Sequence, residues 1–237
     1  MGHNTFFQFK QFRIVQERAG MKVGIDGVLL GAWANTTNCS KILDVGTGTG
    51  LIALMLAQRS EAKITAIEIE ENAAGEAGDN ALLSPWKDRI KVRHISFQDF
   101  AEKNTATFDL IVSNPPYFSN ASKAATTERS LARHNDKLPF SALIELSTKM
   151  LSANGRLSII VPFDVMTAIV DTAKKSNLFL QRITTIKPKA EKAANRVLLE
   201  WGKKETALNE SCLVVYNEDN SFTPEYIELT RDFYLKF

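Results

Sequence analysis

The chain is poor in the residues that build disulfide frameworks and zinc sites. Its 237 residues include two cysteines, Cys39 and Cys212, and three histidines. Two cysteines far apart in the sequence predict no disulfide framework, and no paired Cys/His spacing is present to bind zinc. We therefore expect no resident metal.

Long apolar runs and targeting segments are also missing from the sequence. No stretch approaches the ~20 apolar residues that span a bilayer. Residues 1–10 lack the basic region and apolar stretch of a signal peptide. We expect a cytoplasmic protein with no membrane partner that acts as a monomer, folded as one large domain with small additions.

The net charge of +2 conceals an uneven distribution along the chain. Residues 121–204 hold 15 Lys and Arg against 7 Asp and Glu, whereas residues 205–237 hold 2 against 7. The basic stretch is either an ordinary solvated surface or a surface for phosphate groups, and charge alone leaves both interpretations open.

Apolar runs of strand length alternate with helical patterns along most of the chain. The expected strands are 41–45, 63–69, 90–96, 108–113, 155–162, 179–186 and 196–202. The expected helices are 50–59, 71–83, 139–151, 164–176 and a terminal helix over 224–235. This alternation predicts a doubly wound α/β fold with a mostly parallel sheet, whose ligands bind at the carboxyl ends of the strands.

A glycine-rich loop joins the first expected strand to the first helix of this unit. The loop, residues 46–50, follows the strand 41–45, and Glu68 lies about 20 residues farther on, where a ribose-binding carboxylate is expected. The cofactor-binding residues that we expect here are Asp44, Gly46, Gly48, Gly50 and Glu68.

The loop differs from that of a dinucleotide-binding dehydrogenase. Its spacing is Gly-x-Gly-x-Gly, and Asp44 would repel a pyrophosphate but suits a cation such as the amino group of a methionine moiety. The pattern Asp-x-Gly-x-Gly-x-Gly resembles motif I of class I methyltransferases that use S-adenosylmethionine.

The run Asn114-Pro115-Pro116-Tyr117 follows the fourth strand and predicts a site for a planar amine. Two prolines end the strand and leave carbonyl acceptors that no helix consumes, and Asn114 adds a side-chain acceptor. Tyr117 adds a ring for stacking. Two acceptors and a flat ring suit an exocyclic NH2 group such as that of adenine. We expect these four residues to be catalytic, and Asn114 also to contact the cofactor.

Two further segments are candidates for cofactor contact. Lys22 and Asp26 precede the glycine loop, and Asp26 either caps the apolar helix after it or reaches the polar end of the cofactor. Many class I methyltransferases place an Asp after the third strand to accept from the adenine amine. Here Ser96 and Phe97 stand there, with Asp99 as a possible replacement.

The sequence as a whole resembles the bacterial valine-tRNA adenine N6-methyltransferases. The resemblance is carried by residues 9–12, 21–33, 51–58, 84–86, 108–117, 196–199 and 233–235. It implies a seven-stranded class I fold, S-adenosylmethionine as methyl donor, and a tRNA substrate modified at the adenine 3′ of the anticodon. We expect one methyltransferase domain with a cap segment (1–38), a catalytic core (39–204) and a C-terminal strand and helix extension (205–237).

The four-residue motif and the basic stretch also indicate how such a substrate would bind. Tyr117 would stack on the target base, which must leave its own stack, and Asn114 and Pro115 would hold the amine. We expect Arg133 and Arg196 to contact the substrate. The wider set of candidates for tRNA phosphates is Lys123, Arg129, Arg133, Lys187, Lys189, Lys192 and Arg196.

Other enzymes use the same four-residue motif, and the sequence weighs against them. A protein glutamine methyltransferase usually has a helical N-terminal domain, for which the segment before Lys41 is too short. An rRNA guanine methyltransferase more often has Phe in place of Tyr117 and a duplicated domain. A binding protein that has lost catalysis is disfavoured by the intact motif.

Overall fold

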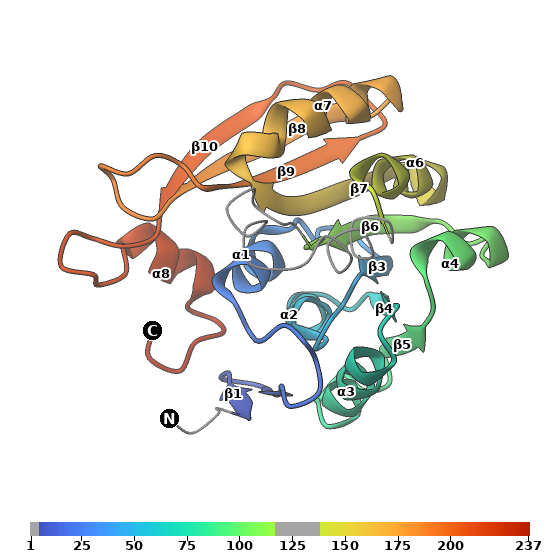
Figure 1. Ribbon diagram of the computed structural model, residues 1–237, viewed down its shortest axis with the longest axis horizontal. Helices are drawn as coiled ribbons and strands as arrows, with labels where there is room; N and C mark the ends of the chain where they lie inside the picture. The colour runs from blue at the N-terminus through green and yellow to red at the C-terminus, as the bar shows by residue number, and fades with distance from the viewer. Residues whose placement is uncertain (1–4, 117–137) are drawn as a thin grey trace, which may run out of the picture.

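The computed structural model describes residues 5–116 and 138–237 and shows a central sheet between two layers of helices (Figure 1). The confirmed α/β class follows from the alternation of strands and helices along the chain. The strands of the main sheet are β3 (Lys41–Val45), β4 (Lys63–Glu68), β5 (Ile90–His94), β6 (Phe108–Ser113), β7 (Leu151–Pro162), β8 (Phe179–Lys187), β9 (Arg196–Gly202) and β10 (Asn209–Val214).

The strand order is β10-β8-β9-β7-β6-β3-β4-β5. Only β9 runs antiparallel to its neighbours β7 and β8. The chain goes outward from β3 through β4 to β5 and then returns to the other side of β3 with β6, so the topological switch point lies between β3 and β6. Asp44 and Asn114 come from these two strands or their ends.

The described part of the main sheet has eight strands, one more than the seven expected. The additional strand is β10, which pairs parallel with β8 at the edge. It lies in the C-terminal extension (205–237), for which a strand was expected without bounds, and its first residues are polar and exposed, which hides the strand pattern. The class of fold is unaffected because β10 extends the sheet on the side away from the switch point.

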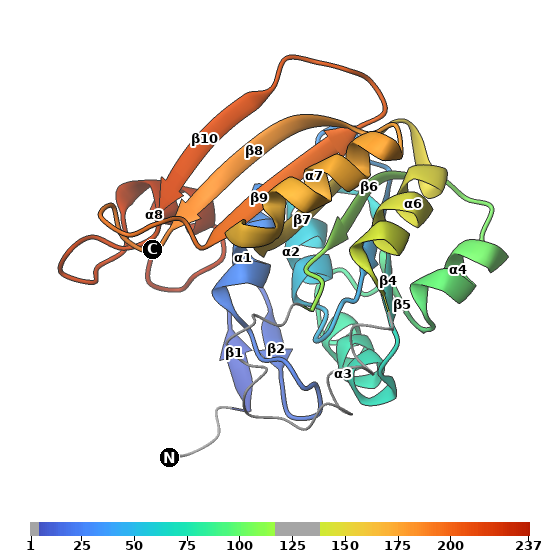
Figure 2. The same cartoon turned by 45° about the horizontal axis from the view of Figure 1, so that its top comes forward.

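Helices cover both faces of the sheet (Figures 1 and 2). One hydrophobic cluster lies between the sheet and α1, α2 and the terminal segments, and the other lies under α4, α6 and α7. The helices are α1 (Ile25–Trp33), α2 (Leu51–Arg59), α3 (Glu71–Leu82), α4 (Phe97–Lys103), α6 (Phe140–Met150), α7 (Met166–Lys175) and α8 (Pro224–Thr230), with a short 3-10 turn η2 (Phe163–Val165).

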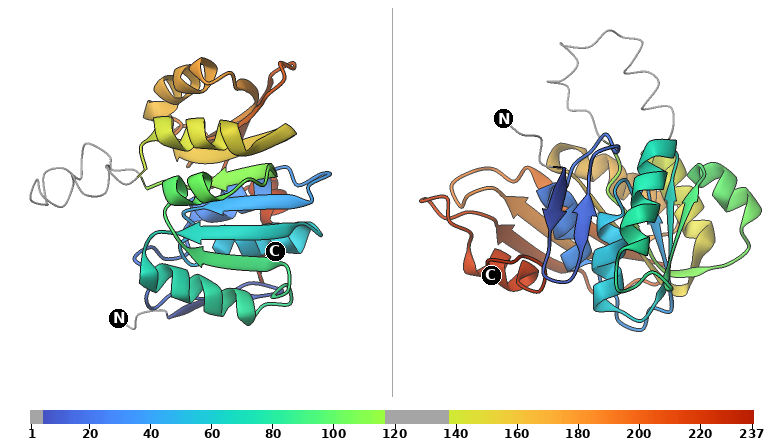
Figure 3. Two further views of the ribbon diagram at one scale, coloured as in Figure 1. Left: turned by 90° about the vertical axis from the view of Figure 1, so that its right-hand side faces the viewer. Right: turned by 90° about the horizontal axis from the view of Figure 1, so that it is seen from below.

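The two ends of the described chain pack against each other. Strands β1 (Phe6–Gln8) and β2 (Arg13–Val15) form a hairpin that Figure 3 shows between α3 and the C-terminal segment. The backbone N–H of Lys10 donates to the carbonyl of Phe233 at 2.8 Å. Helix α8 ends at Thr230, earlier than predicted, and buried Tyr226 and Phe233 anchor this segment in the core.

No helix among residues 5–116 and 138–237 is long and apolar enough to cross a membrane. Within the same residues, no group of three or more His, Cys, Asp or Glu side chains is gathered that could hold a metal ion.

Candidate active site

The glycine loop forms a turn with open space above it. Gly46, Gly48 and Gly50 all have positive φ (72°, 56° and 84°), which favours glycine because other residues meet steric strain there. A Cβ built at Gly46 or Gly48 would meet no atom within 4 Å. The loop is fixed from below, since the N–H groups of Gly46 and Thr47 both donate to the carbonyl of Ile67.

Asp44 lies under this loop and is fully buried. Its Oδ2 accepts from the Thr47 hydroxyl at 2.6 Å and from the Ala53 N–H at 3.1 Å, at the start of α2. Its Oδ1 is buried without a hydrogen-bond partner among the described residues. Burial raises the pKa of Asp44 to about 7 and the charge of Glu68 adds to this, although the two hydrogen bonds lower it. An ammonium group would supply the missing donor and favour the ionised form.

Glu68 ends β4 on the other side of the loop and accepts several backbone N–H groups. Its Oε1 accepts from Ile69 and Glu70 at 2.8 and 3.0 Å, and its Oε2 accepts from Gly48 at 2.9 Å. A carboxylate has about four lone-pair sites, so one on Oε2 stays available for a hydroxyl donor. The position predicted for a ribose-binding carboxylate is therefore held rigidly beside the loop.

The corner made by Asn114, Pro115 and Pro116 lies next to the glycine loop. Ser113 pairs with Val45 in the parallel ladder, so the next residues, Asn114 and Gly46, are neighbours at the carboxyl edge. The Ser113 hydroxyl donates to the carbonyl of Val45 at 2.8 Å. This bond is useful here because neither proline has an N–H to continue the ladder.

The side-chain oxygen of Asn114 is the second buried acceptor without a partner in the described part of the site. Pro115 is buried and Pro116 is exposed, so the corner opens outward beyond Pro115. Unpaired buried acceptors are costly and rare, which points to a donor that arrives with a ligand. Tyr117 and Arg133 lie outside the described residues, as do Lys123 and Arg129.

These features fit S-adenosylmethionine. The loop offers space above two glycines, Asp44 an unpaired oxygen for the amino group, and Glu68 an acceptor for the ribose. Asn114 follows β6, the strand that pairs with β3, so it lies at the carboxyl edge of the sheet beside the glycine loop.

The third candidate segment has a structural role that the sequence prediction did not include. Ser96 is the N-cap of α4, where its hydroxyl accepts from the Asp99 N–H at 3.0 Å and donates to the Asp99 carboxylate at 2.8 Å. Phe97 is buried under the same helix. The spacing Ser-x-x-Asp before an apolar residue is a capping signal that could have predicted α4.

The prediction that Asp26 caps α1 was wrong. The N-cap is Gly24, without a side-chain cap, and Asp26 lies in the first turn. Its carboxylate instead accepts from Nε of Arg196 at 2.9 Å, in a half-buried ion pair between α1 and β9. A cofactor candidate and a substrate candidate therefore contact each other. Lys22 is exposed on the preceding loop.

Two buried polar residues of α3 hold the N-terminal segment beside the site, and sequence reasoning missed both. The Glu76 carboxylate accepts backbone N–H groups from residues 17–19 at 2.6 to 2.9 Å. The Asn80 amide donates to the carbonyls of Val15 and Thr49, each at 2.9 Å. Because the partners are 31 to 65 residues away in sequence, no local pattern predicts these bonds.

Comparison with known proteins agrees with this geometry. A family model described as the methyltransferase small domain matches residues 27–168. A curated tRNA1(Val) (adenine(37)-N6)-methyltransferase of Trichodesmium erythraeum is 45% identical over 100% of both chains. The chain belongs to this methyltransferase family. Relatives with the same name from Parabacteroides distasonis and Haemophilus influenzae are 42% and 44% identical over 98% of this chain and 99% of their own.

Similar solved structures show that this chain has the class I methyltransferase fold. A predicted O-methyltransferase from Agrobacterium tumefaciens superposes with a TM-score of 0.68 at 22% identity, over 88% of this chain and 96% of that one. An rRNA guanine N2-methyltransferase of T. thermophilus, solved with AdoMet and guanosine, gives a TM-score of 0.56 at 17% identity, over 84% and 50%. At these identities the likeness concerns the fold.

Proposed function

We propose that this chain transfers a methyl group from S-adenosylmethionine to the exocyclic N6 of an adenine in the anticodon loop of a tRNA. The named relatives, which match over their full length, support valine tRNA and the adenine 3′ of the anticodon. The observation that carries the chemistry is the buried, unpaired oxygen of Asn114 beside the glycine loop.

The cofactor would be held by residues at the ends of β3, β4 and β5 and by residues around the start of α1. Asp44 would bind the amino group, Glu68 the ribose hydroxyls, and Gly46, Gly48 and Gly50 would let the backbone approach closely. Ser96, Phe97 and Asp99 would line the adenine side, and Lys22 and Asp26 the methionine side. When bound, S-adenosylmethionine supplies a methyl group made electrophilic by its sulfonium.

The chain's own contribution to the reaction is the positioning of a weak nucleophile. The lone pair of an aromatic amine is delocalised into its ring. The Asn114 oxygen and the Pro115 carbonyl would accept its two N–H groups and favour a pyramidal nitrogen whose lone pair is free. No strong base is needed, because the extra proton leaves the nitrogen for water after transfer. Such positioning contributes several kcal/mol to catalysis.

The remaining site residues belong to the substrate side of the proposal. Tyr117 would stack on the extruded adenine, Pro116 would fix the turn before it, and Arg133 and Arg196 would contact the RNA. The chain would work as a single catalytic domain and a monomer in the cytoplasm, where tRNA is modified.

The direct test is methyl transfer from labelled S-adenosylmethionine to total tRNA from cells that lack this protein, followed by nucleoside analysis. N6-methyladenosine in valine tRNA is the expected product. Methylguanosine, or label in protein glutamine instead of RNA, would reject the proposal. Asn114→Ala serves as the catalytic control because the cofactor site is left intact.

A further inference from the structure

Phe163 directly follows β7 at the carboxyl edge of the sheet, and it belongs to neither hydrophobic cluster of the described residues. We propose that Phe163 is a stacking platform for a nucleotide next to the target adenine. It would form, with Arg196 and the basic loop between β8 and β9, a track along which the RNA strand crosses the sheet edge. This inference rests on the proposed function.

Phe163 lies one strand away from the catalytic corner. In the parallel pairing of β6 and β7, Ser113 is opposite Ile159. β6 ends at Ser113, whereas β7 continues to Pro162, and Phe163 follows directly. Phe163 and the Asn114 corner therefore follow the carboxyl ends of two neighbouring strands of the sheet.

The side chain of Phe163 is only partly covered by the described residues. It is 37% exposed and belongs to neither hydrophobic cluster, although the following Val165 and Met166 pack against one of them. A single exposed phenylalanine is unremarkable by itself. Its position at the carboxyl edge of the sheet, where the substrate would bind, makes it a candidate for contact with the RNA.

The backbone around Phe163 is held in place from two sides. Pro162 pairs with Arg196 in the antiparallel ladder. The N–H of Phe163 donates to the carbonyl of Asn195 at 3.2 Å. A short 3-10 turn begins at Phe163 and leads directly into α7. An aromatic ring on a fixed backbone loses little entropy on stacking, which favours its use as a platform.

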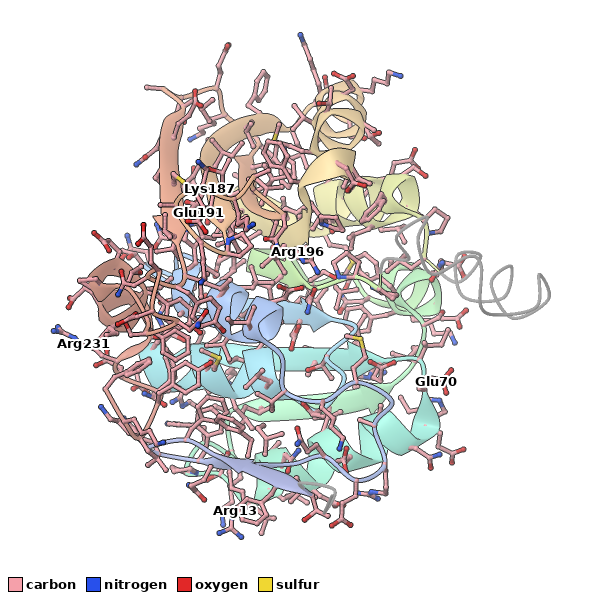
Figure 4. The ribbon with its side chains drawn as sticks, turned by 60° about the vertical axis from the view of Figure 1, so that its left-hand side comes forward. Arg13, Glu70, Lys187, Glu191, Arg196 and Arg231 are labelled. Atoms are coloured by element: carbon pink, nitrogen blue, oxygen red, sulfur yellow. The ribbon has the colours of Figure 1, made fainter. Side chains whose placement is uncertain are left out.

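Cations continue the row beyond Phe163. Arg196 is paired both with Pro162 of β7 and with Ile186 of β8, and Lys187 follows Ile186 at the end of β8. Figure 4 shows Arg196 beside α1, with Lys187 and Glu191 in the neighbouring orange part of the ribbon. Lys192 is exposed in the same β8–β9 loop.

The chemistry of this row fits a single RNA strand. Single-stranded nucleic acids bind to grooves that combine cations for the backbone with aromatic rings for the bases. A base that leaves its stack exposes the faces of its neighbours, and a ring that covers one of them lowers the cost of extrusion. Because every base can stack on an aromatic ring, Phe163 would increase the affinity for RNA without adding sequence specificity.

The test compares three variants of the full chain in tRNA binding and in steady-state kinetics. Phe163→Ala should weaken tRNA binding and raise the KM for tRNA by between about 5-fold and 100-fold, the range of base–aromatic stacking. Phe163→Trp should restore both, whereas Phe163→Leu should not. The affinity for S-adenosylmethionine and the kcat at saturating tRNA should stay at their wild-type values.

Phe179 provides a matched control. It has the same exposed fraction, 37%, but begins β8 at the opposite edge of the sheet. Phe179→Ala should bind tRNA as the wild type does. If Phe163→Ala and Phe179→Ala behave alike while the wild type methylates tRNA, the stacking inference fails and the proposed function stands. If the wild type does not methylate tRNA, the proposed function itself fails.

Abasic anticodon stem-loops identify the partner base. One lacks the base 5′ of the target adenine and the other the base 3′ of it. The effect of Phe163→Ala should vanish with one of them, because the stacking partner is then already missing. A defect that persists unchanged with both would overturn the inference, and so would a loss confined to kcat, which would place the ring on the target base.

Discussion

Replacing Asp44 by Asn should raise the stability of the cofactor-free protein at neutral pH and weaken its binding of the cofactor. The Asp44 carboxyl is fully buried and its pKa is raised from 3.8 to about 7. The folded protein therefore binds this proton more tightly than the unfolded chain does. As pH rises from about 4 to about 7, the unfolding free energy falls, because the unfolded chain releases this proton whereas the folded protein retains it.

The magnitude follows from the pKa shift. A shift of about 3 pKa units at about 1.4 kcal/mol each gives an upper limit of about 4 kcal/mol, lost between those two pH values. Asparagine keeps an oxygen for Thr47 and Ala53 and carries no charge. The cofactor-free Asp44→Asn protein should thus be more stable than the wild type by about 1 kcal/mol at pH 4.5 and by up to about 4 kcal/mol at pH 8.

The assay is urea unfolding of cofactor-free protein followed by tryptophan fluorescence between pH 4.5 and 8, with calorimetric measurement of S-adenosylmethionine binding. Asp44→Asn should weaken cofactor binding about 10-fold or more, because an ammonium group loses its ionic partner. If the variant is less stable than the wild type by the same amount at every pH, Asp44 is ionised and stabilising in the free protein, and the reasoning is wrong.

Asp109 is the matched control and should show the opposite sign. Burial opposes its ionisation, but hydrogen bonds from Ser40, Lys41 and Ser152 outweigh burial and hold its pKa below the ordinary value. Its carboxylate stabilises the fold above the unfolded pKa, and this contribution is lost as pH falls through the folded pKa. Asp109→Asn should therefore lower the unfolding free energy at pH 7. The difference from the wild type should shrink as pH falls, because Asp109 is then protonated in the wild type as well.

Three further predictions concern the proposed site. Asn114→Ala should lower kcat by about 100-fold or more, the range found for single polarising groups, while calorimetry shows an unchanged S-adenosylmethionine affinity; near-normal turnover would contradict the role of Asn114. In a double-mutant cycle of the unfolding free energy, Asp26→Ala and Arg196→Ala should be coupled by about 1 kcal/mol. The two side chains are only 17% and 27% exposed, so the ion pair is partly shielded from water. Additive effects would show that the ion pair contributes nothing. The logarithm of tRNA affinity should fall linearly with the logarithm of salt concentration, and Lys192→Ala should reduce that slope by about 0.7, so an unchanged slope would remove Lys192 from the RNA surface.

Regular strands were the easiest features to predict from this sequence. The bounds of β3, β6 and β9 agree with the prediction to the residue, because each is an apolar run that ends at a loop or a proline. Strand β7 begins earlier than expected, at Leu151, which pairs with Phe108. The register shifts between Phe108 and Leu110, and a Cβ at Gly155 would come within 2.6 Å of the Phe108 carbonyl.

Polar residues whose roles depend on distant partners were the hardest to predict. Asp44 and Asn114 could be proposed from the sequence because each lies at a strand end directly before glycines or prolines. Arg196 and Asp26 are 170 residues apart in sequence, and only the fold brings them together. The antiparallel β9 between β7 and β8 places Arg196 on the row that includes Phe163, which the sequence pattern alone did not single out.

The proposed reaction requires Asn114 to hold the acceptor amine next to the methyl donor, and one structure tests this requirement most directly. A crystal structure with S-adenosylmethionine bound should show its amino group near Asp44 and its methyl carbon directed toward the Asn114 corner, with room for a nitrogen about 3–3.5 Å from that carbon. A methyl group that points away from the corner, with the cofactor otherwise bound as described, would contradict the account.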